Sequence, residues 1–136
     1  MCLYGYALRG KGFAVDHWMP SVLVVEDDTA TRQLLATCLQ MEGFSVQTAT
    51  NGEEGLEQMR QRRPCVVLLD LMMPVMSGEQ FRNAQLRDPS LARVPVVCIS
   101  AVYDAQERAQ QINAVACINK PFDILELVDV VREQCR

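Results

Sequence analysis

The residues best suited to chemistry in this sequence are three acids, a serine and a lysine, each placed where a short apolar run ends. In chain order they are Glu26 and Asp27 after the first run, Asp70 ending the third, Ser100 ending the fourth and Lys120 after the fifth. Three carboxylates within a few ångströms would repel one another by about 1–4 kcal/mol per pair, depending on the effective dielectric. A hard cation that prefers oxygen ligands, Mg²⁺ above all, relieves such repulsion. The set therefore indicates metal-assisted chemistry at a carboxylate, if the fold brings the five residues together.

The elements that must position these residues alternate regularly from Ser21 onward, as apolar runs followed by helical patterns. The first run, 22–25, is apolar on both faces, which suits a parallel strand covered by helices on each side. The run 44–49 alternates apolar and polar residues and is predicted to lie at an exposed edge. The other expected strands are 66–70, 94–100 and 116–119, and the expected helices are 29–42, 53–62, 78–86, 104–112 and a last one capped by Asp123.

Two details of the helices are predicted from local sequence. Gly43 is expected to end the first helix in a left-handed conformation. The apolar face of that helix is expected to comprise Leu34, Leu35, Cys38, Leu39 and Met41, and that of the last helix Ile124, Leu127, Val128 and Val131.

Strand–helix alternation predicts an α/β fold, a doubly wound five-stranded parallel sheet with right-handed crossovers and helices on both faces. In such sheets ligands bind at the carboxyl ends of the strands, near the point where strand order reverses. All five polar residues fall at that end, so we expect them to converge on one crevice.

The composition of the chain excludes some classes of function. The chain has 136 residues, 49% apolar and 22% charged, with a net charge of −4, which suits one globular domain with a sizeable core. No basic stripe is present to neutralise phosphates, so direct nucleic-acid binding is not expected. No apolar stretch approaches the ~20 residues needed to span a bilayer, so no membrane role is expected.

The cysteines and the first 19 residues gave two further expectations. The six cysteines form no CxxC pair, and Cys65 and Cys98 lie in apolar runs, so we expect reduced thiols and a cytoplasmic protein. Residues 1–19 lack periodicity and are expected to be a poorly ordered extension before a natural start at Met19. The alternative is a short element that packs through its aromatic side chains, Tyr4, Tyr6, Phe13 and Trp18.

Four segments carry a family resemblance: VLVVEDD, LLDLMMPVMSG, VCISA and INKPF. They resemble, in order and element type, the signature segments of response-regulator receiver domains (the CheY-like superfamily), over residues 20–136. The resemblance implies a flavodoxin-like sheet with strand order 2-1-3-4-5. It also implies a phosphoacceptor module of a two-component or phosphorelay system, which catalyses only its own phosphorylation and dephosphorylation and is otherwise not an enzyme.

The resemblance implies a role for each candidate residue. Asp27 and Asp70 would ligate Mg²⁺ directly with the backbone carbonyl of Met72, and Glu26 would act through a bound water; Mn²⁺ can substitute. Asp70 would be the phosphoacceptor.

Two further residues would contact the phosphoryl oxygens. The Ser100 hydroxyl would donate a hydrogen bond to one oxygen, and Lys120 would bring a positive charge to another. A cis peptide bond is implied between Lys120 and Pro121, the one kind of bond where the cis form costs little.

The implied partners are a sensor histidine kinase or a histidine phosphotransfer protein, and a downstream output protein or domain. The single histidine, His17, lies in the first 19 residues, so the phosphohistidine is expected to come from another protein. Dimerisation through the fourth and fifth helices is common in the family, so a homodimer on phosphorylation is among the partners that the resemblance implies.

The sequence departs from the family at three positions. Cys117 stands where most receivers have an aromatic residue that reorients on phosphorylation, so we expect signalling through the 100–102 loop without an aromatic rotamer change. Met72 and Val102 are apolar where polar side chains orient an attacking water, which predicts slow self-dephosphorylation.

Two alternatives stay open. A binding-only relative that never accepts phosphate is disfavoured because the whole set of reactive residues is present. A phosphatase of the haloacid dehalogenase type also uses an aspartate nucleophile, but it needs a second aspartate two positions later, where Met72 stands. Taken singly, each candidate also has an ordinary explanation, such as acidic residues at a helix start.

Overall fold

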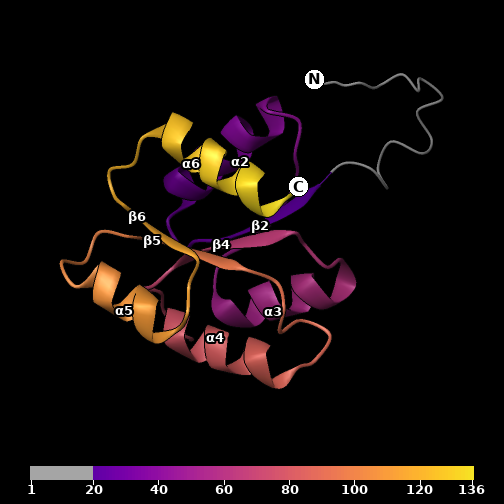
Figure 1. The fold of residues 1–136 in the computed structure, drawn as a ribbon, viewed down its shortest axis with the longest axis vertical. Helices are drawn as coiled ribbons and strands as arrows, with labels where there is room; N and C mark the ends of the chain where they lie inside the picture. Colours follow the sequence, from indigo (N-terminus) through magenta and orange to yellow (C-terminus); the bar gives the residue numbers. More distant parts are fainter. Residues whose placement is uncertain (1–19) are drawn as a thin grey trace.

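The structure, a computed structural model, describes residues 20–136, so the expected extension over residues 1–19 lies outside it. Strands and helices alternate along the described part of the chain (Figure 1). The strands are β2 (Ser21–Val25), β3 (Ser45–Ala49), β4 (Val66–Asp70), β5 (Val96–Ser100) and β6 (Ala116–Asn119). The helices are α2 (Thr29–Met41), α3 (Gly52–Gln61), α4 (Gly78–Arg87), α5 (Ala105–Gln111) and α6 (Ile124–Gln134).

The five strands form one parallel sheet in the order β3-β2-β4-β5-β6. This confirms the doubly wound, flavodoxin-like order 2-1-3-4-5 expected from the sequence. After β2 the chain first forms β3 on one side and then crosses to β4 on the other, so strand order reverses between β2 and β4. The half-buried strand β3 lies at the edge, as its alternating sequence predicted.

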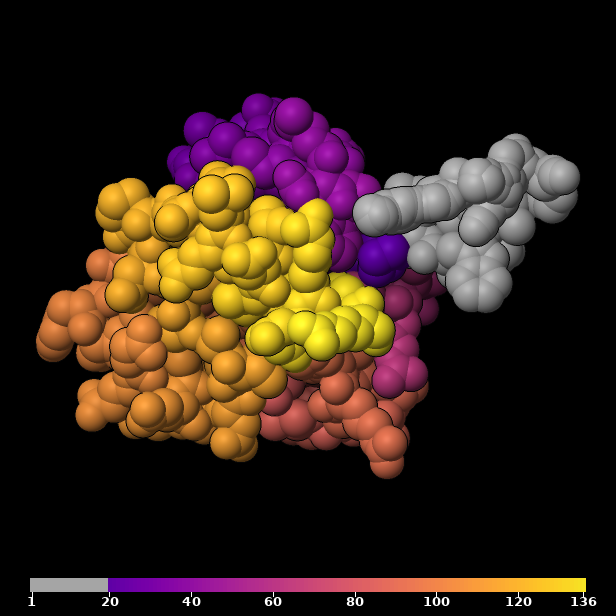
Figure 2. All heavy atoms as spheres, turned by 45° about the horizontal axis from the view of Figure 1, so that its top comes forward, coloured from indigo at the N-terminus to yellow at the C-terminus, as the bar shows by residue number. Residues whose placement is uncertain are grey.

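Helices cover both faces of the sheet, α2 and α6 on one and α3, α4 and α5 on the other (Figure 1). Alternate residues of β2 enter the two cores: Val22 and Val24 pack toward Leu39 and Leu127, whereas Leu23 and Val25 face the opposite layer. In the space-filling view, α6 lies directly beside α2 (Figure 2). Burial on both faces explains why β2, β4 and β5 are almost wholly apolar.

Two local predictions needed correction. Only Leu35 and Leu39 are fully buried on α2, whereas Leu34 is 50% and Met41 80% exposed. Because α2 shares its sheet face with α6, the sheet buries only part of the apolar face of α2. The fourth strand begins at Val96 rather than Val94, since Pro95 has no amide hydrogen to donate to a strand ladder.

The predicted helix ends agree with the structure. Gly43 follows α2 with φ +98°, a conformation that costs glycine little. Asp123 caps α6 by accepting a hydrogen bond from the amide of Leu125.

The prediction that all the cysteines are reduced was wrong. Cys65 and Cys135 form a disulfide, with Cα atoms 5.2 Å apart across a sequence separation of 70. The pairing has no signature in local spacing, because it arises only when the end of α6 reaches the residue before β4. The free cysteines of the described part are Cys38, Cys98 and Cys117, and burial raises the pKa of Cys98 to about 12.

Within residues 20–136, no helix has the length and apolar character that crossing a bilayer requires.

Candidate functional site

The site lies at the carboxyl ends of the strands, beside the point where strand order reverses. The ends of β2 and β4 bring Glu26, Asp27 and Asp70 together, so that a carboxylate oxygen of each lies within 4.8 Å of the others. Lys120, which follows β6, contacts two of these carboxylates although it is 94 positions from Glu26 in sequence. The predicted convergence of these four residues is therefore confirmed.

Glu26 is the most deeply buried acid of the site, with no exposed surface. Its carboxylate accepts hydrogen bonds from the Lys120 ammonium (2.7 Å) and from the amide of Asp28 (3.1 Å). Burial raises the pKa of Glu26, and the two hydrogen bonds only partly oppose this effect. Glu26 therefore anchors the lysine in this structure.

Lys120 bridges Glu26 and Asp70, with its ammonium 2.7 Å from the first and 3.3 Å from the second. Burial alone would lower the pKa of Lys120, but the hydrogen bond to Glu26 and the charges of both acids outweigh it and hold the pKa above its usual range. The lysine is therefore a permanent positive charge at neutral pH. The Lys120-Pro121 peptide bond is cis, as the resemblance implied.

Asp70 is 4% exposed and is fixed at both oxygens. One oxygen accepts a hydrogen bond from the amide of Met72 (3.0 Å), and the other faces Lys120. The loop after Asp70 lies close under the start of α4, where a Cβ on Gly78 would come within 3.0 Å of the Leu71 Cα and 3.3 Å of the Asp70 carbonyl oxygen. A Cβ at this position would force the loop to shift by a few tenths of an ångström, so Gly78 helps set the position of the loop.

Ser100 is fully buried at the end of β5, next to the same crevice. Its hydroxyl oxygen accepts a hydrogen bond from the amide of Val102 (3.2 Å), and its carbonyl accepts one from the amide of Lys120 (2.9 Å). Because the Val102 bond occupies only a lone pair of the hydroxyl, its O–H remains able to donate.

Sequence reasoning missed one residue that shapes the site. Arg32, on the first turn of α2, donates to the backbone carbonyls of Glu26 (2.9 Å) and Asp27 (3.3 Å). It thereby fixes the acidic turn from behind, while Asp28 caps α2 by accepting from the Thr31 amide and hydroxyl. The hydrogen bonds from Thr31 lower the pKa of Asp28. The available signal was an arginine one turn into the helix that follows three acids.

The three positions that depart from the family lie around the site. Met72 is 54% exposed, and its sulfur lies 3.3 Å from the guanidinium of Arg108, which also pairs with Glu79 (2.6 Å). Val102 and Cys117 are partly buried and pack against the core under α5.

Comparison with known proteins agrees with this geometry. The family model of the response regulator receiver domain matches residues 22–132. The chain is 33% identical over 120 residues to a DNA-binding dual master transcriptional regulator of Synechocystis, RpaA, and covers 50% of that protein with 87% of itself. It is 27% identical over 114 residues to the polar-differentiation response regulator DivK of Brucella anthropi, covering 93% of that protein with 82% of itself.

Solved structures give the same result. The chemotaxis protein CheY4 of Vibrio cholerae is 27% identical and superposes with a TM-score of 0.78 over 85% of this chain and 98% of that one. The chain therefore belongs to the response regulator receiver domain family. It is similar to a receiver domain of two-component signalling throughout its described fold, and it spans about half the length of the first curated relatives it matches.

Proposed function

We propose that Asp70 is the phosphoacceptor of this receiver domain and takes a phosphoryl group from a phosphohistidine on a partner protein. The observation that supports the proposal is the clustering of three carboxylates within 4.8 Å, with Lys120 in contact with two of them. Such a dense negative cluster is unfavourable without a cation, and carboxylate oxygens are the donors that Mg²⁺ prefers.

The acidic cluster fits a resident Mg²⁺ in its donor chemistry. Asp27 and Asp70 would ligate the ion directly with the carbonyl of Met72, and Glu26 would act through a water. Bound there, Mg²⁺ would neutralise the charge that spreads over the phosphoryl oxygens during transfer. Mn²⁺, a cation of similar ligand preference, can take its place.

The chain's own residues perform the remaining work. The Asp70 carboxylate attacks phosphorus, the bond from phosphorus to the histidine nitrogen breaks, and the leaving imidazole keeps the electron pair. Lys120 moves its positive charge from the carboxylates to a phosphoryl oxygen, and the Ser100 hydroxyl donates to another. The hydrogen bond from the Met72 amide holds the attacking carboxylate in place.

The partners follow from this chemistry. A sensor histidine kinase or a histidine phosphotransfer protein would supply the phosphoryl group, and an output protein or domain would read the modified state. We also propose a cytoplasmic location, which the unpaired thiols of Cys38, Cys98 and Cys117 favour. The apolar side chains of Met72 and Val102 support slow self-dephosphorylation.

The test is incubation of the purified protein with acetyl phosphate and MgCl₂, followed by intact mass measurement. Wild type is expected to gain one phosphoryl group, which EDTA prevents. Asp70→Asn is expected to gain none, whereas Asp129→Asn, which removes an exposed carboxylate from α6, should behave as wild type. Equal labelling of Asp70→Asn would overturn the assignment.

A further inference from the structure

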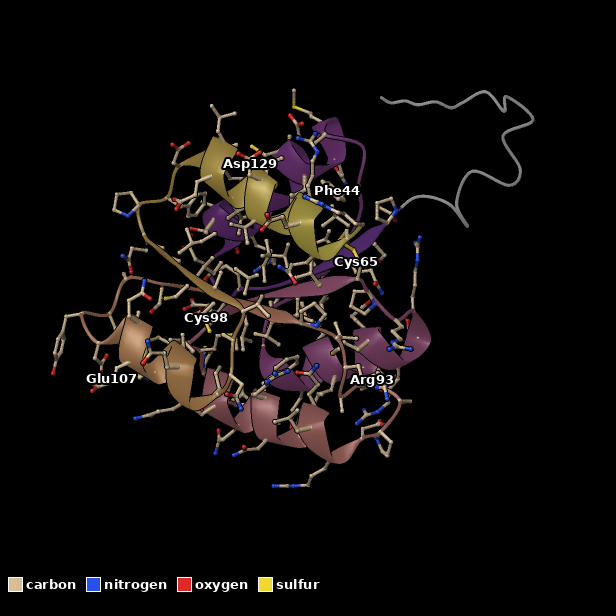
Figure 3. The ribbon with its side chains drawn as sticks, in the orientation of Figure 1. Phe44, Cys65, Arg93, Cys98, Glu107 and Asp129 are labelled. Carbon is tan, nitrogen blue, oxygen red and sulfur yellow. A yellow bond between two sulfur atoms is a disulfide. The ribbon has the colours of Figure 1, made fainter. Side chains whose placement is uncertain are left out.

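A second pocket opens at the other end of the sheet, where the strands begin. It has a volume of about 580 Å³, and Arg62, Arg63, Arg93 and Cys65 are among the residues that line it. In Figure 3, Cys65 and Arg93 lie at the end of the molecule opposite Glu107, which is near the carboxyl ends of the strands. The pocket is therefore separate from the acidic cluster.

The pocket is positively charged in a chain whose net charge is −4. Among residues 20–136, no acidic side chain lines it. Arg63 and Arg93 are exposed and take part in no salt bridge within residues 20–136, while Arg62 donates to the Ser45 hydroxyl (3.0 Å). Two exposed guanidinium groups, Arg63 and Arg93, that form no salt bridge within residues 20–136 favour a small anionic ligand.

A disulfide forms part of the wall of this pocket. Cys65 lines it and is bonded to Cys135, and both residues are partly exposed. The Cys65 sulfur also lies 3.1 Å from the Ser21 carbonyl oxygen, which can accept a hydrogen bond from the thiol once the disulfide is reduced. Cys65 therefore has a bonding partner in both redox forms: Cys135 when it is oxidised, and the Ser21 carbonyl when it is a thiol.

Disulfides in a reducing cytoplasm, the location proposed above, are usually transient and serve catalysis or redox sensing. Positive charge beside an accessible disulfide attracts anionic thiols. It also favours their thiolate form, which is the species that attacks a disulfide.

We propose that this pocket is a thiol–disulfide exchange site for small thiols that carry carboxylates. The thiolate attacks the Cys65 sulfur, the bond between Cys65 and Cys135 breaks, and its electron pair leaves on Cys135, which takes a proton from water. A second thiolate then attacks the outer sulfur of the mixed disulfide and releases Cys65 as a thiolate, which is protonated in turn. Two thiols are oxidised to one small disulfide, and the protein gains two thiols. The attack falls on Cys65 because Cys65, and not Cys135, lines the pocket.

The test compares three thiols of different charge on the oxidised full chain: glutathione (anionic), 2-mercaptoethanol (neutral) and cysteamine (cationic). The variants are Arg63→Ala/Arg93→Ala and, as the matched control, Arg87→Ala, which removes an exposed arginine of α4 that does not line the pocket. Acid quenching and peptide mass mapping measure the rate of disulfide loss and the cysteine that carries the mixed disulfide. Each variant is compared with wild type for the same thiol, so intrinsic thiol reactivity cancels.

In the double variant the rate with glutathione, whose thiolate carries a net charge of −2, should fall about fivefold at low salt, because two exposed positive charges beside the attacked disulfide are lost. The rate with 2-mercaptoethanol, whose thiolate carries one negative charge, should fall less. The rate with cysteamine, whose thiolate form is a zwitterion without net charge, should stay unchanged, which also shows that the fold is intact. Arg87→Ala should change none of them, and the mixed disulfide should map to Cys65. Absence of a Cys65–Cys135 disulfide in air-oxidised protein, or equal changes for all three thiols, would overturn the proposal.

Discussion

Replacing Asp27 by asparagine should stabilise the metal-free protein and remove most of the stabilisation that Mg²⁺ provides. The side chain of Asp27 is exposed, and its carboxylate lies within 4.8 Å of those of Glu26 and Asp70. At 4.8 Å two like charges repel by about 0.9 kcal/mol in a water-like dielectric and about 3.5 kcal/mol at an effective dielectric of 20. Because Asp27 is exposed, the lower value is nearer the truth for each pair.

Only part of this repulsion is specific to the folded state. Glu26 precedes Asp27 in the chain, so their repulsion persists in the unfolded state, whereas Asp70 approaches only on folding. Asp27→Asn should therefore stabilise the metal-free protein by about 0.9 kcal/mol, or roughly 4 °C in Tm for a domain of this size. In wild type, Mg²⁺ at ten times its Kd should add about 1.4 kcal/mol, and the variant should lose most of this increment.

The assay is urea unfolding at pH 8, in EDTA and in MgCl₂, followed by circular dichroism. Asp129→Asn is the control for loss of one negative charge, since Asp129 is exposed on α6, away from the site (Figure 3). The reasoning would be refuted if Asp27→Asn were less stable than wild type in EDTA, or if it kept the full stabilisation by Mg²⁺.

Four further predictions concern single side chains. Arg82 is buried and donates to the carbonyls of Ile112 and Asn113 and to the Gln85 side chain. Arg82→Met leaves these buried acceptors unpaired and should lower the free energy of unfolding in urea by about 3 kcal/mol. A loss under about 1 kcal/mol would contradict this. Burial raises the pKa of Cys98 from 9.0 to about 12. Above pH 9 the unfolded state therefore binds fewer protons than the folded state, and the free energy of unfolding should fall as pH rises from about 9 to 12. Cys98→Ala should show a shallower fall, and a parallel profile would argue against the assignment. Cys135→Ser opens a loop closed across a separation of 70 residues and should cost about 4 kcal/mol under oxidising conditions and little in reductant; an equal cost in both would show that packing, not the cross-link, was lost. Met72→Asn should shorten the lifetime of the Asp70 phosphate by placing a polar group near phosphorus, as measured by phosphate release, and an unchanged lifetime would remove the proposed cause of slow dephosphorylation.

Much of the fold could be predicted because burial on two faces leaves a clear trace in sequence. Apart from Ser21 at the start of β2, the strands β2 and β4 are apolar until they reach the crevice, where the polar residues of the site appear. The site followed from the same logic, since the carboxyl ends of parallel strands meet at one edge of the sheet. The sequence therefore predicted that Glu26 and Lys120 lie close together, although 94 positions separate them.

The remaining features depend on tertiary contacts that local patterns do not encode. The Cys65–Cys135 disulfide forms because the end of α6 passes the start of β4, and cysteine spacing carries no trace of this. The exposure of Leu34 depends on how much of the sheet α6 occupies. Arg32 supports the acidic turn by donating to backbone carbonyls. Because every residue has a carbonyl, the accepting positions carry no sequence signal for such contacts.

The most direct measurement of the central proposal is chemical mapping of the phosphorylated residue. After phosphorylation by acetyl phosphate and Mg²⁺, borohydride reduction converts an aspartyl phosphate to homoserine, which peptide mass spectrometry then locates. Conversion at Asp70 alone, lost when EDTA is present during phosphorylation, is the expected result. Conversion at Asp27 or Asp28 with Asp70 unmodified, or no conversion in protein that binds Mg²⁺, would contradict the proposed site.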